Sequence, residues 1–233
     1  MSCLTVSINI SRSPCRVQRM GWFSILLLSR YNGMDANMRR MIMMSLCLLW
    51  DIGDAQAREY VWIKHRLLIT HEFYNQIIYT RDITLWGQKD YWATPEETLR
   101  GFKGDCEDIA IAKYFSLLRQ GIPFERLRLA YLLLASSAPR TYHLVLEYHH
   151  EDGIDVLDNR YSQIYSANET YHAQTIMTFD LHYMWINNVR IGESQVRMGK
   201  WASLLVRHQH QAAVVLEKQR MTQVMPHLVK EFW

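Results

Sequence analysis

One short stretch, Gly104-Asp105-Cys106-Glu107-Asp108, constrains the fold of this chain more than any other. It places a cysteine among three carboxylates, directly before a run in which Ile111, Tyr114, Phe115 and Leu118 follow the spacing of one helix face. We therefore expect a helix from about Cys106 to Gln120 that is capped by Asp105 and packs on a core. The cysteine then lies in the first turn, where backbone N–H groups and the helix dipole favour a thiolate.

Three strand-like runs follow this helix and should supply the core on which it packs. They are Leu127–Ala135, Thr141–Tyr148 and Ile154–Leu157. The second and third runs are separated only by a short turn at His149–Gly153, which predicts an antiparallel hairpin. In that register opposed residue numbers add up to about 301 or 302, so His143 is expected to face Asp158 to within one residue. Chain geometry alone thus predicts a contact between a histidine and a carboxylate.

Further elements are predicted on both sides of this unit. Thr94-Pro95-Glu96-Glu97 is a helix start in which Thr94 is the cap and Glu97 completes a capping box. The remaining predictions are one or two helices within Tyr60–Tyr79, a strand pair within Phe179–Ile191 with Asn187-Asn188 as its turn, and a long helix from Met198 to about Val224. Together they predict an α+β fold, with the cysteine-bearing helix on an antiparallel sheet, N-terminal helices and a C-terminal helical tail.

The first 57 residues have the composition of a leader. They hold six arginines and three acidic residues, whereas the rest of the chain has 20 basic and 20 acidic residues. Met38-Arg39-Arg40 precedes the apolar run Met41–Trp50, which is too short to span a bilayer, and Ala55-Gln56-Ala57 has the form of a signal-peptidase site. We expect export with cleavage after Ala57. The alternatives are a buried N-terminal helix or a retained anchor that also uses Met20–Leu28.

These observations divide the chain into a leader (residues 1–57), one domain (58–197) and a C-terminal helical extension (198–233). Residues 1–33 resemble no domain, and a start codon at Met34 or Met38 explains them most simply. After cleavage of the leader we expect no stable membrane insertion. The remaining chain is formally neutral and has no basic stripe with interleaved aromatic residues, which argues against nucleic acid as a partner.

The cysteine count points to a free thiol with a function. Three of the four cysteines lie in the leader, so the mature chain keeps only Cys106 and cannot form an internal disulfide. A cysteine nucleophile needs a base, and the base needs a partner that holds its tautomer. His143 and Asp158 meet this need from neighbouring strands. The plainer alternatives are a buried structural cysteine, a structural histidine and an aspartate that merely ends a strand.

The acidic residues around Cys106 raise an electrostatic problem. Asp105, Glu107 and Asp108 lie within two residues of the thiol, and uncompensated negative charge raises a thiol pKa, which opposes nucleophilic attack. Either these side chains point to solvent, or a cation lies among them. Oxygen ligands from closely spaced acids suit a hard ion such as Ca²⁺, although the segment is not an EF-hand loop.

Four motifs resemble the bacterial transglutaminase-like cysteine proteinases, the LapG-type periplasmic adhesin proteases. They are WATPEE at 92–97, GDCEDIAIAKY at 104–114, HLVL at 143–146 and VLDN at 156–159. The resemblance spans about Tyr60 to Trp185 and implies a papain-like, transglutaminase-like fold. It implies that Cys106 is the nucleophile, His143 the general base and Asp158 the residue that orients it. It also implies calcium dependence with Asp105 and Glu107 as ion-binding positions, and leaves open whether Asp108 binds the ion or only caps the helix.

The same resemblance implies a biological role in the periplasm. Proteases of this family cleave the N-terminal region of a large repetitive surface adhesin next to an Ala-Ala pair, which releases the adhesin and promotes biofilm dispersal. The periplasmic domain of an inner-membrane cyclic-di-GMP receptor acts as their inhibitor. Two alternatives remain open for this chain: acyl transfer to an amine, as in transglutaminases, and a non-catalytic binding module with a remnant triad.

Overall fold

The computed structural model describes residues 35–134, 141–167 and 173–224 of the chain. The chain divides into two compact units, Met1–Glu59 and Tyr60–Trp233, and the boundary falls within the long helix α2 (Ala36–Tyr74). Residues 1–33, with the alternative anchor at Met20–Leu28, lie outside the described residues. Within the described part, no helix has both the length and the apolar character needed to cross a membrane.

The second unit is built on a seven-stranded antiparallel sheet with the strand order β6-β5-β4-β3-β7-β8-β9. Its strands are β3 (Leu127–Leu134), β4 (Thr141–His150), β5 (Gly153–Leu157), β6 (Tyr165–Ser166), β7 (Ala173–Phe179), β8 (Tyr183–Ile186) and β9 (Val189–Glu193). A separate parallel pair joins β1 (Ile78–Tyr79) to β2 (Lys103–Gly104), immediately before Cys106.

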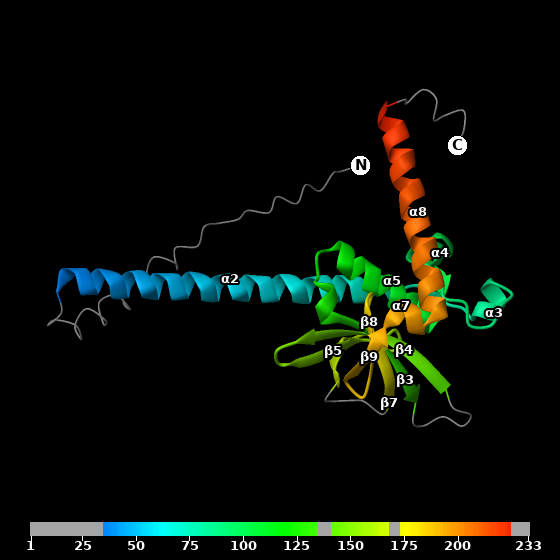
Figure 1. Ribbon diagram of the computed structural model, residues 1–233, viewed down its shortest axis with the longest axis horizontal. Coiled ribbons are helices and arrows are strands. Elements are labelled where there is room, and N and C mark those ends of the chain that lie inside the picture. The colour runs from blue at the N-terminus through cyan, green and yellow to red at the C-terminus, as the bar shows by residue number, and fades with distance from the viewer. Residues whose placement is uncertain (1–34, 135–140, 168–172, 225–233) are drawn as a thin grey trace, which may run out of the picture. The chain divides into compact units, whose positions relative to one another are not determined.

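Helices cover one face of this sheet, with α5 packed across β3 and β4 (Figure 1). Besides α2, the helices are α3 (Asp82–Leu85), α4 (Pro95–Gly101), α5 (Cys106–Arg119), the 3₁₀ turn η1 (Phe124–Arg126), α7 (Ser194–Arg197) and α8 (Gly199–Val224). The arrangement is the α+β, papain-like and transglutaminase-like architecture that the sequence predicts.

The predicted starts of α4 and α5 are confirmed by their caps. The Thr94 hydroxyl accepts a hydrogen bond from the Glu97 N–H at 3.2 Å, and the Glu97 carboxylate accepts one from the Thr94 N–H at 2.8 Å. Helix α5 begins directly after its cap residue Asp105. It is followed by Gly121 at φ +86°, a backbone conformation that favours glycine.

The hairpin of β4 and β5 forms as predicted, but its register differs. Leu146 pairs with Leu157, and the turn is only Glu151-Asp152, shorter than the turn that the sequence suggested. Asp158 therefore lies beyond the last pair of the ladder, and the prediction that it stands directly opposite His143 is wrong. The two side chains meet diagonally instead, which the reach between neighbouring strands allows.

The end of the sheet contains one predicted turn and one unpredicted strand. Strands β8 and β9 are joined at Asn187 and Asn188, which have φ angles of +49° and +61°, as a type I′ hairpin turn requires. Strand β7 was not predicted, although its sequence AQTIMTF is rich in β-formers. It pairs with β3 and so brings β8 and β9 into the same sheet.

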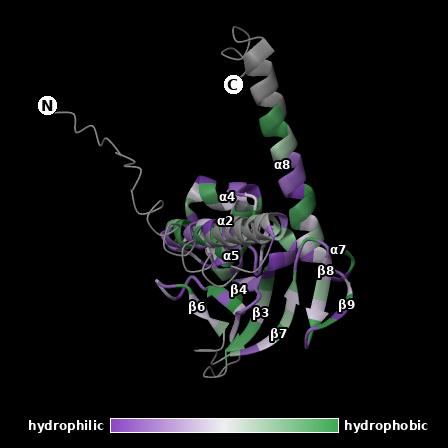
Figure 2. Cartoon of the chain, turned by 90° about the vertical axis from the view of Figure 1, so that its left-hand side faces the viewer, coloured by the Kyte–Doolittle hydropathy of each residue, from purple (hydrophilic) through white to green (hydrophobic). Residues whose placement is uncertain are grey.

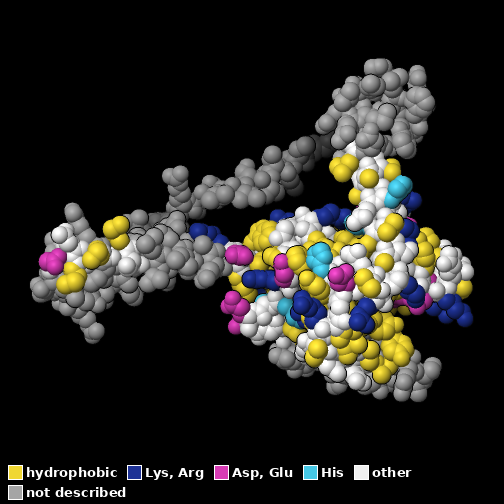
Figure 3. Space-filling model, in the orientation of Figure 1, with side chains coloured by type: hydrophobic (Ala, Val, Ile, Leu, Met, Phe, Trp, Pro, Cys, Tyr) yellow, Lys and Arg dark blue, Asp and Glu magenta, His cyan; other side chains and the backbone are white. Residues whose placement is uncertain are grey.

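The main core lies between the sheet and the helices, and it includes the beginning of α8. Trp201 and Leu204 of α8 are fully buried in the same cluster as Tyr114 and Phe115 of α5. Bands of hydrophobic and hydrophilic residues alternate along α8 in Figure 2. The first turns of the predicted C-terminal extension are thus part of the domain core. On the face drawn in Figure 3, basic and acidic side chains are interspersed.

Candidate active site

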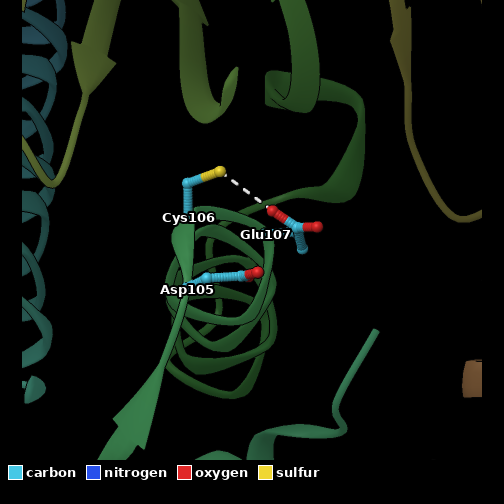
Figure 4. Close-up of side chains that lie close together, drawn as sticks. All are labelled: Asp105, Cys106 and Glu107. Atoms are coloured by element: carbon cyan, nitrogen blue, oxygen red, sulfur yellow. Dashed lines mark hydrogen bonds between the residues drawn. The ribbon is translucent and has the colours of Figure 1, made fainter. Parts of the chain in front are cut away.

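Cys106 is placed by the junction of β2 and α5. Gly104 makes this junction possible, because a Cβ atom at that position would lie 2.7 Å from the Cβ atom of Asp108. The thiol is partly buried at the first turn of α5 and points toward Glu107, with Sγ donating to Oε2 at 2.9 Å (Figure 4). Burial and the negative charge of Glu107 raise the pKa of the Cys106 thiol well above its ordinary value. Without a compensating charge, this thiol stays protonated.

His143 and Asp158 form the expected pair. The Nε2 atom of His143 lies 2.8 Å from Oδ1 of Asp158, and both side chains are buried. Arg160 also donates to this carboxylate, through its backbone N–H at 2.9 Å and its Nη2 atom at 2.7 Å. Burial alone would raise the pKa of Asp158, but the hydrogen bonds from His143 and Arg160 bring it well below its usual range. Asp158 is therefore ionised and can hold the imidazole in one orientation.

The cysteine and the histidine strand meet at Leu144. The backbone of Leu144, the residue after His143, lowers the pKa of the Cys106 thiol and so acts against burial and the charge of Glu107. Because Nε2 of His143 is engaged by Asp158, Nδ1 is the ring nitrogen that remains for proton exchange. Cys106 comes from a helix N-terminus, His143 from a strand of the sheet and Asp158 from the end of the neighbouring strand. The structure thus pairs His143 with Asp158, and the catalytic roles of Cys106, His143 and Asp158 remain predictions.

Three buried aspartates lie close together, two of them at the start of α5 next to Cys106. Carboxylate oxygens of Asp82, Asp105 and Asp108 all lie within 4.8 Å of one another. Asp108 accepts hydrogen bonds from the Ala93 N–H at 2.8 Å and the Asp105 N–H at 3.4 Å. The Oδ1 atoms of Asp82 and Asp105, in contrast, are buried without a hydrogen-bond partner among the described residues. Burying these like charges together costs free energy unless a cation lies between the carboxylates.

The pKa values of these aspartates also indicate that ionising them at this place costs free energy. Burial, together with the neighbouring carboxylates, raises the pKa of Asp82 to about 6, of Asp105 to about 9 and of Asp108 to about 7. Glu107 adds a further carboxylate, since ligand atoms of Asp105, Cys106 and Glu107 also lie within 4.8 Å of one another. Several oxygen donors with unsatisfied lone pairs fit a hard divalent cation such as Ca²⁺, which prefers oxygen ligands.

Asp82 is a candidate ligand that the sequence analysis missed. It begins the short helix α3, and its other oxygen accepts a hydrogen bond from the Tyr91 N–H at 2.6 Å. Its sequence context, Arg81-Asp82-Ile83, contains nothing that separates it from an ordinary surface aspartate. Only the folding of the 80–92 segment over the start of α5 brings it to Asp105.

A helix-borne cysteine on an antiparallel sheet, with a histidine–aspartate pair on the adjoining strands, defines a cysteine enzyme of the papain-like and transglutaminase-like class. Residues 50–190 match the model of the bacterial transglutaminase-like cysteine proteinases, and the chain belongs to this family.

The chain is also similar to solved structures of one protein of this kind. Legionella pneumophila LapG in an EGTA-treated form is 32% identical, with a TM-score of 0.55 over 63% of this chain and 79% of that one. The calcium-bound form of the same protein is 34% identical, with a TM-score of 0.53 over 62% of this chain and 80% of that one. The search of curated proteins gave no match.

Proposed function

We propose that this chain is a calcium-dependent periplasmic cysteine endopeptidase that cleaves the N-terminal region of a large surface adhesin. The observation that carries the proposal is the hydrogen bond between His143 and the buried, ionised carboxylate of Asp158. Membership of a cysteine proteinase family supports the reaction type. Release of the adhesin, and with it biofilm dispersal, follows from cleavage near its anchored end.

The proposed reaction uses the three residues in sequence. His143 takes the thiol proton, and the Cys106 thiolate attacks the scissile carbonyl carbon to form a tetrahedral adduct. His143 then gives its proton to the leaving amine as the peptide C–N bond breaks, leaving a thioester. A water molecule that loses a proton to His143 hydrolyses the thioester and restores the thiol. The Cys106 backbone N–H, exposed at the helix start, is the candidate donor to the oxyanion.

We propose that Asp105, Glu107 and Asp82 hold a calcium ion, with Asp108 oriented toward the same point by its two backbone hydrogen bonds. When bound, the ion supplies positive charge that offsets the carboxylates and so favours ionisation of the thiol. The calcium-bound and EGTA-treated forms of the similar Legionella protein support the choice of ion. The unpartnered oxygens of Asp82 and Asp105 support it independently.

The decisive experiment mixes the purified chain with the N-terminal fragment of a candidate adhesin that carries an Ala-Ala site. We expect cleavage in calcium, no cleavage in EGTA and no cleavage by Cys106→Ala. Mass spectrometry of the reaction products detects the fragments. Unchanged cleavage at vanishing free calcium would refute calcium dependence. Intact activity of Cys106→Ala would support the binding-module alternative instead.

The same three residues could also transfer an acyl group to an amine. Adding a labelled primary amine to the cleavage reaction separates the two activities. Incorporation of the amine without chain cleavage would contradict the endopeptidase proposal.

We further propose that the periplasmic domain of a cyclic-di-GMP receptor in the inner membrane sequesters this protease. Addition of that domain in excess should stop cleavage of the adhesin fragment. Cleavage at an unchanged rate in its presence would remove the receptor from the proposal.

A further inference from the structure

A lysine is fully buried in the middle of α5, away from the nucleophile. Lys113 has no exposed side-chain surface, and its Nζ atom lies 2.7 Å from Oδ1 of Asn75, 3.2 Å from the Leu157 carbonyl oxygen and 3.4 Å from Nδ1 of His71. A lysine ammonium has three donors, and three acceptors surround this one. Burial lowers the pKa of Lys113 to about 7, while the charge of Asp158 acts in the opposite direction. The side chain therefore has a complete set of partners, one of them on the segment that carries Asp158.

The same segment is held at its other end by His71 of α2 and by Asn75, the residue that follows α2. His71 places Nε2 at 3.1 Å from the Tyr161 carbonyl oxygen, and Asn75 donates to that oxygen from Nδ2 at 2.8 Å. Burial and the nearby Lys113 charge lower the pKa of His71 to about 4, so its ring is neutral. A neutral ring with its proton on Nε2 donates to Tyr161 and accepts from Lys113, which agrees with both distances.

This pair of attachments matters because the sheet does not hold Asp158. The ladder between β4 and β5 ends at Leu157, one residue earlier. The turn that follows is closed by the Tyr161 N–H, which donates to the Asp158 carbonyl oxygen at 3.2 Å. The carbonyl groups of Leu157 and Tyr161, which bracket the turn, are the two that α5 and α2 fix.

We propose that Lys113, His71 and Asn75 are positioning residues that hold the 157–161 turn, so that Asp158 meets the imidazole of His143. The inference rests on the proposed function, since it assigns a role to residues that act through Asp158. Stability alone gives no reason for an ammonium at this place. An apolar side chain of equal length fills the same space without the cost of removing a charge from water.

The test measures the reaction of Cys106 with iodoacetamide, which requires a reactive thiol but no adhesin. The variants are Lys113→Met, Asp158→Asn and the double variant, all in saturating calcium. We expect Lys113→Met to slow alkylation about tenfold. In the Asp158→Asn background the same substitution should have no further effect, because Lys113 acts through Asp158. Equal slowing in both backgrounds would overturn the proposal, as would an unchanged rate for the single variant.

A matched control separates positioning from loss of stability. Leu117 is also fully buried on α5 and belongs to the main core, but its apolar side chain makes no hydrogen bond to the 157–161 turn. Leu117→Ala should lower the unfolding temperature and leave the alkylation rate near that of the parent chain when measured well below that temperature. If Leu117→Ala slowed alkylation as much as Lys113→Met at equal stability, the effect would be structural and the proposal wrong.

Two further variants make every outcome decisive. Should Lys113→Met not fold, Asn75→Ala takes its place in the same cycle, because Asn75 is half-buried and its loss removes one acceptor of Lys113 and one donor to Tyr161. His143→Ala tests the underlying function. If His143→Ala alkylates at the parent rate, the Cys106–His143 mechanism fails. If His143→Ala is slow and neither Lys113→Met nor Asn75→Ala is, the positioning role alone fails.

Discussion

Individual carboxylates around Cys106 set the chemical behaviour of the site. Asp82, Asp105, Glu107 and Asp108 come from two separate segments, yet their oxygens form two close groups that share Asp105, one of which includes the thiol. The same negative charge that would attract a cation also keeps the Cys106 pKa high in its absence. In the proposed function, calcium dependence and nucleophile activation are therefore two consequences of the same carboxylates.

Asp82 should be required for tight calcium binding, although it lies far from Cys106 in the sequence. Asp82→Asn removes one negative charge from the cluster while keeping the side-chain shape, and we expect calcium affinity to fall about tenfold or more. Isothermal titration calorimetry measures the change. Asp152→Asn, in the exposed turn between β4 and β5, is the matched control and should bind as the parent does. Equal affinities for both variants would remove Asp82 from the site.

The calcium-free chain should lose stability as pH rises. Folding raises the pKa of Asp82, Asp105 and Asp108 to about 6, about 9 and about 7 from an ordinary value of 3.8. Groups with raised pKa values stabilise the fold below their unfolded pKa, and this contribution is lost as pH rises through the folded values. In EGTA the unfolding temperature should therefore fall as pH rises from about 4 to about 9.

Thermal unfolding with and without calcium checks this expectation. The gain in unfolding temperature on adding calcium should grow over the same range, because protons then compete less for the carboxylates. Asp105→Asn should reduce both the pH dependence and the gain. A calcium effect that is constant with pH would show that the carboxylates do not carry it.

Sequence reasoning reaches the residues whose neighbours are informative. Cys106 is flanked by the acids and followed by a helical stripe, and His143 and Asp158 follow from a hairpin. Asp82 and Lys113 are different cases, because each looks like an ordinary polar residue in its own segment. Their partners come from 23 to 44 residues away and exist only in the folded chain.

At the scale of elements, helix α8 forms hydrogen bonds with residues 92–97, which precede the nucleophile in the sequence. Gln211 accepts from the Thr94 hydroxyl at 2.6 Å and donates to the Glu97 carboxylate at 3.2 Å, so it joins the capping box of α4. Arg207 donates to the Trp92 carbonyl oxygen at 2.5 Å. The Ala93 N–H between these points holds Asp108. The extension that the sequence set apart as residues 198–233 therefore reaches the acid cluster through one short segment.

Removing the anchor of α8 should destabilise the whole domain. Trp201 is fully buried, in contact with the rings of Tyr114, Phe115 and Phe179. Trp201→Ala should lower the free energy of unfolding by about 3–5 kcal/mol, measured by urea denaturation in calcium. Val206→Ala, at a position that is 67% exposed on the same helix, should change it by less than about 0.5 kcal/mol. Similar values for both variants would mean that α8 does not belong to the core.

The hairpin of β4 and β5 shows why element positions are easier to predict than their register. Both strands were placed from composition, but a turn that is shorter by a few residues shifts which residues oppose each other. Strand β7 was missed because it follows a segment with no clear punctuation, while its pairing with β3 is a long-range contact that no local pattern encodes.

For the whole molecule, the proposed export determines which residues the functional chain keeps. We propose that the leader is removed after Ala57, two residues before the boundary between the two compact units at Glu59. Protein recovered from the periplasm should begin at Arg58 when its N-terminus is determined by mass spectrometry. Replacing Ala57 by a bulky residue such as tyrosine should block processing. A periplasmic chain that still contains residues 41–50 would favour the retained-anchor alternative.

Cleavage at that point has a consequence for α2, which in the uncut chain runs unbroken from Ala36 to Tyr74. The new chain end is an ammonium group on Arg58, so two positive charges stand at the start of a helix whose N-terminus already carries positive partial charge. The first turn should fray until packing resists it, at the buried Ile63 and at Lys64, whose ammonium lies 2.5 Å from Asp155. Maturation would thus convert a helical stretch into a short loose arm that carries the exposed aromatic ring of Tyr60.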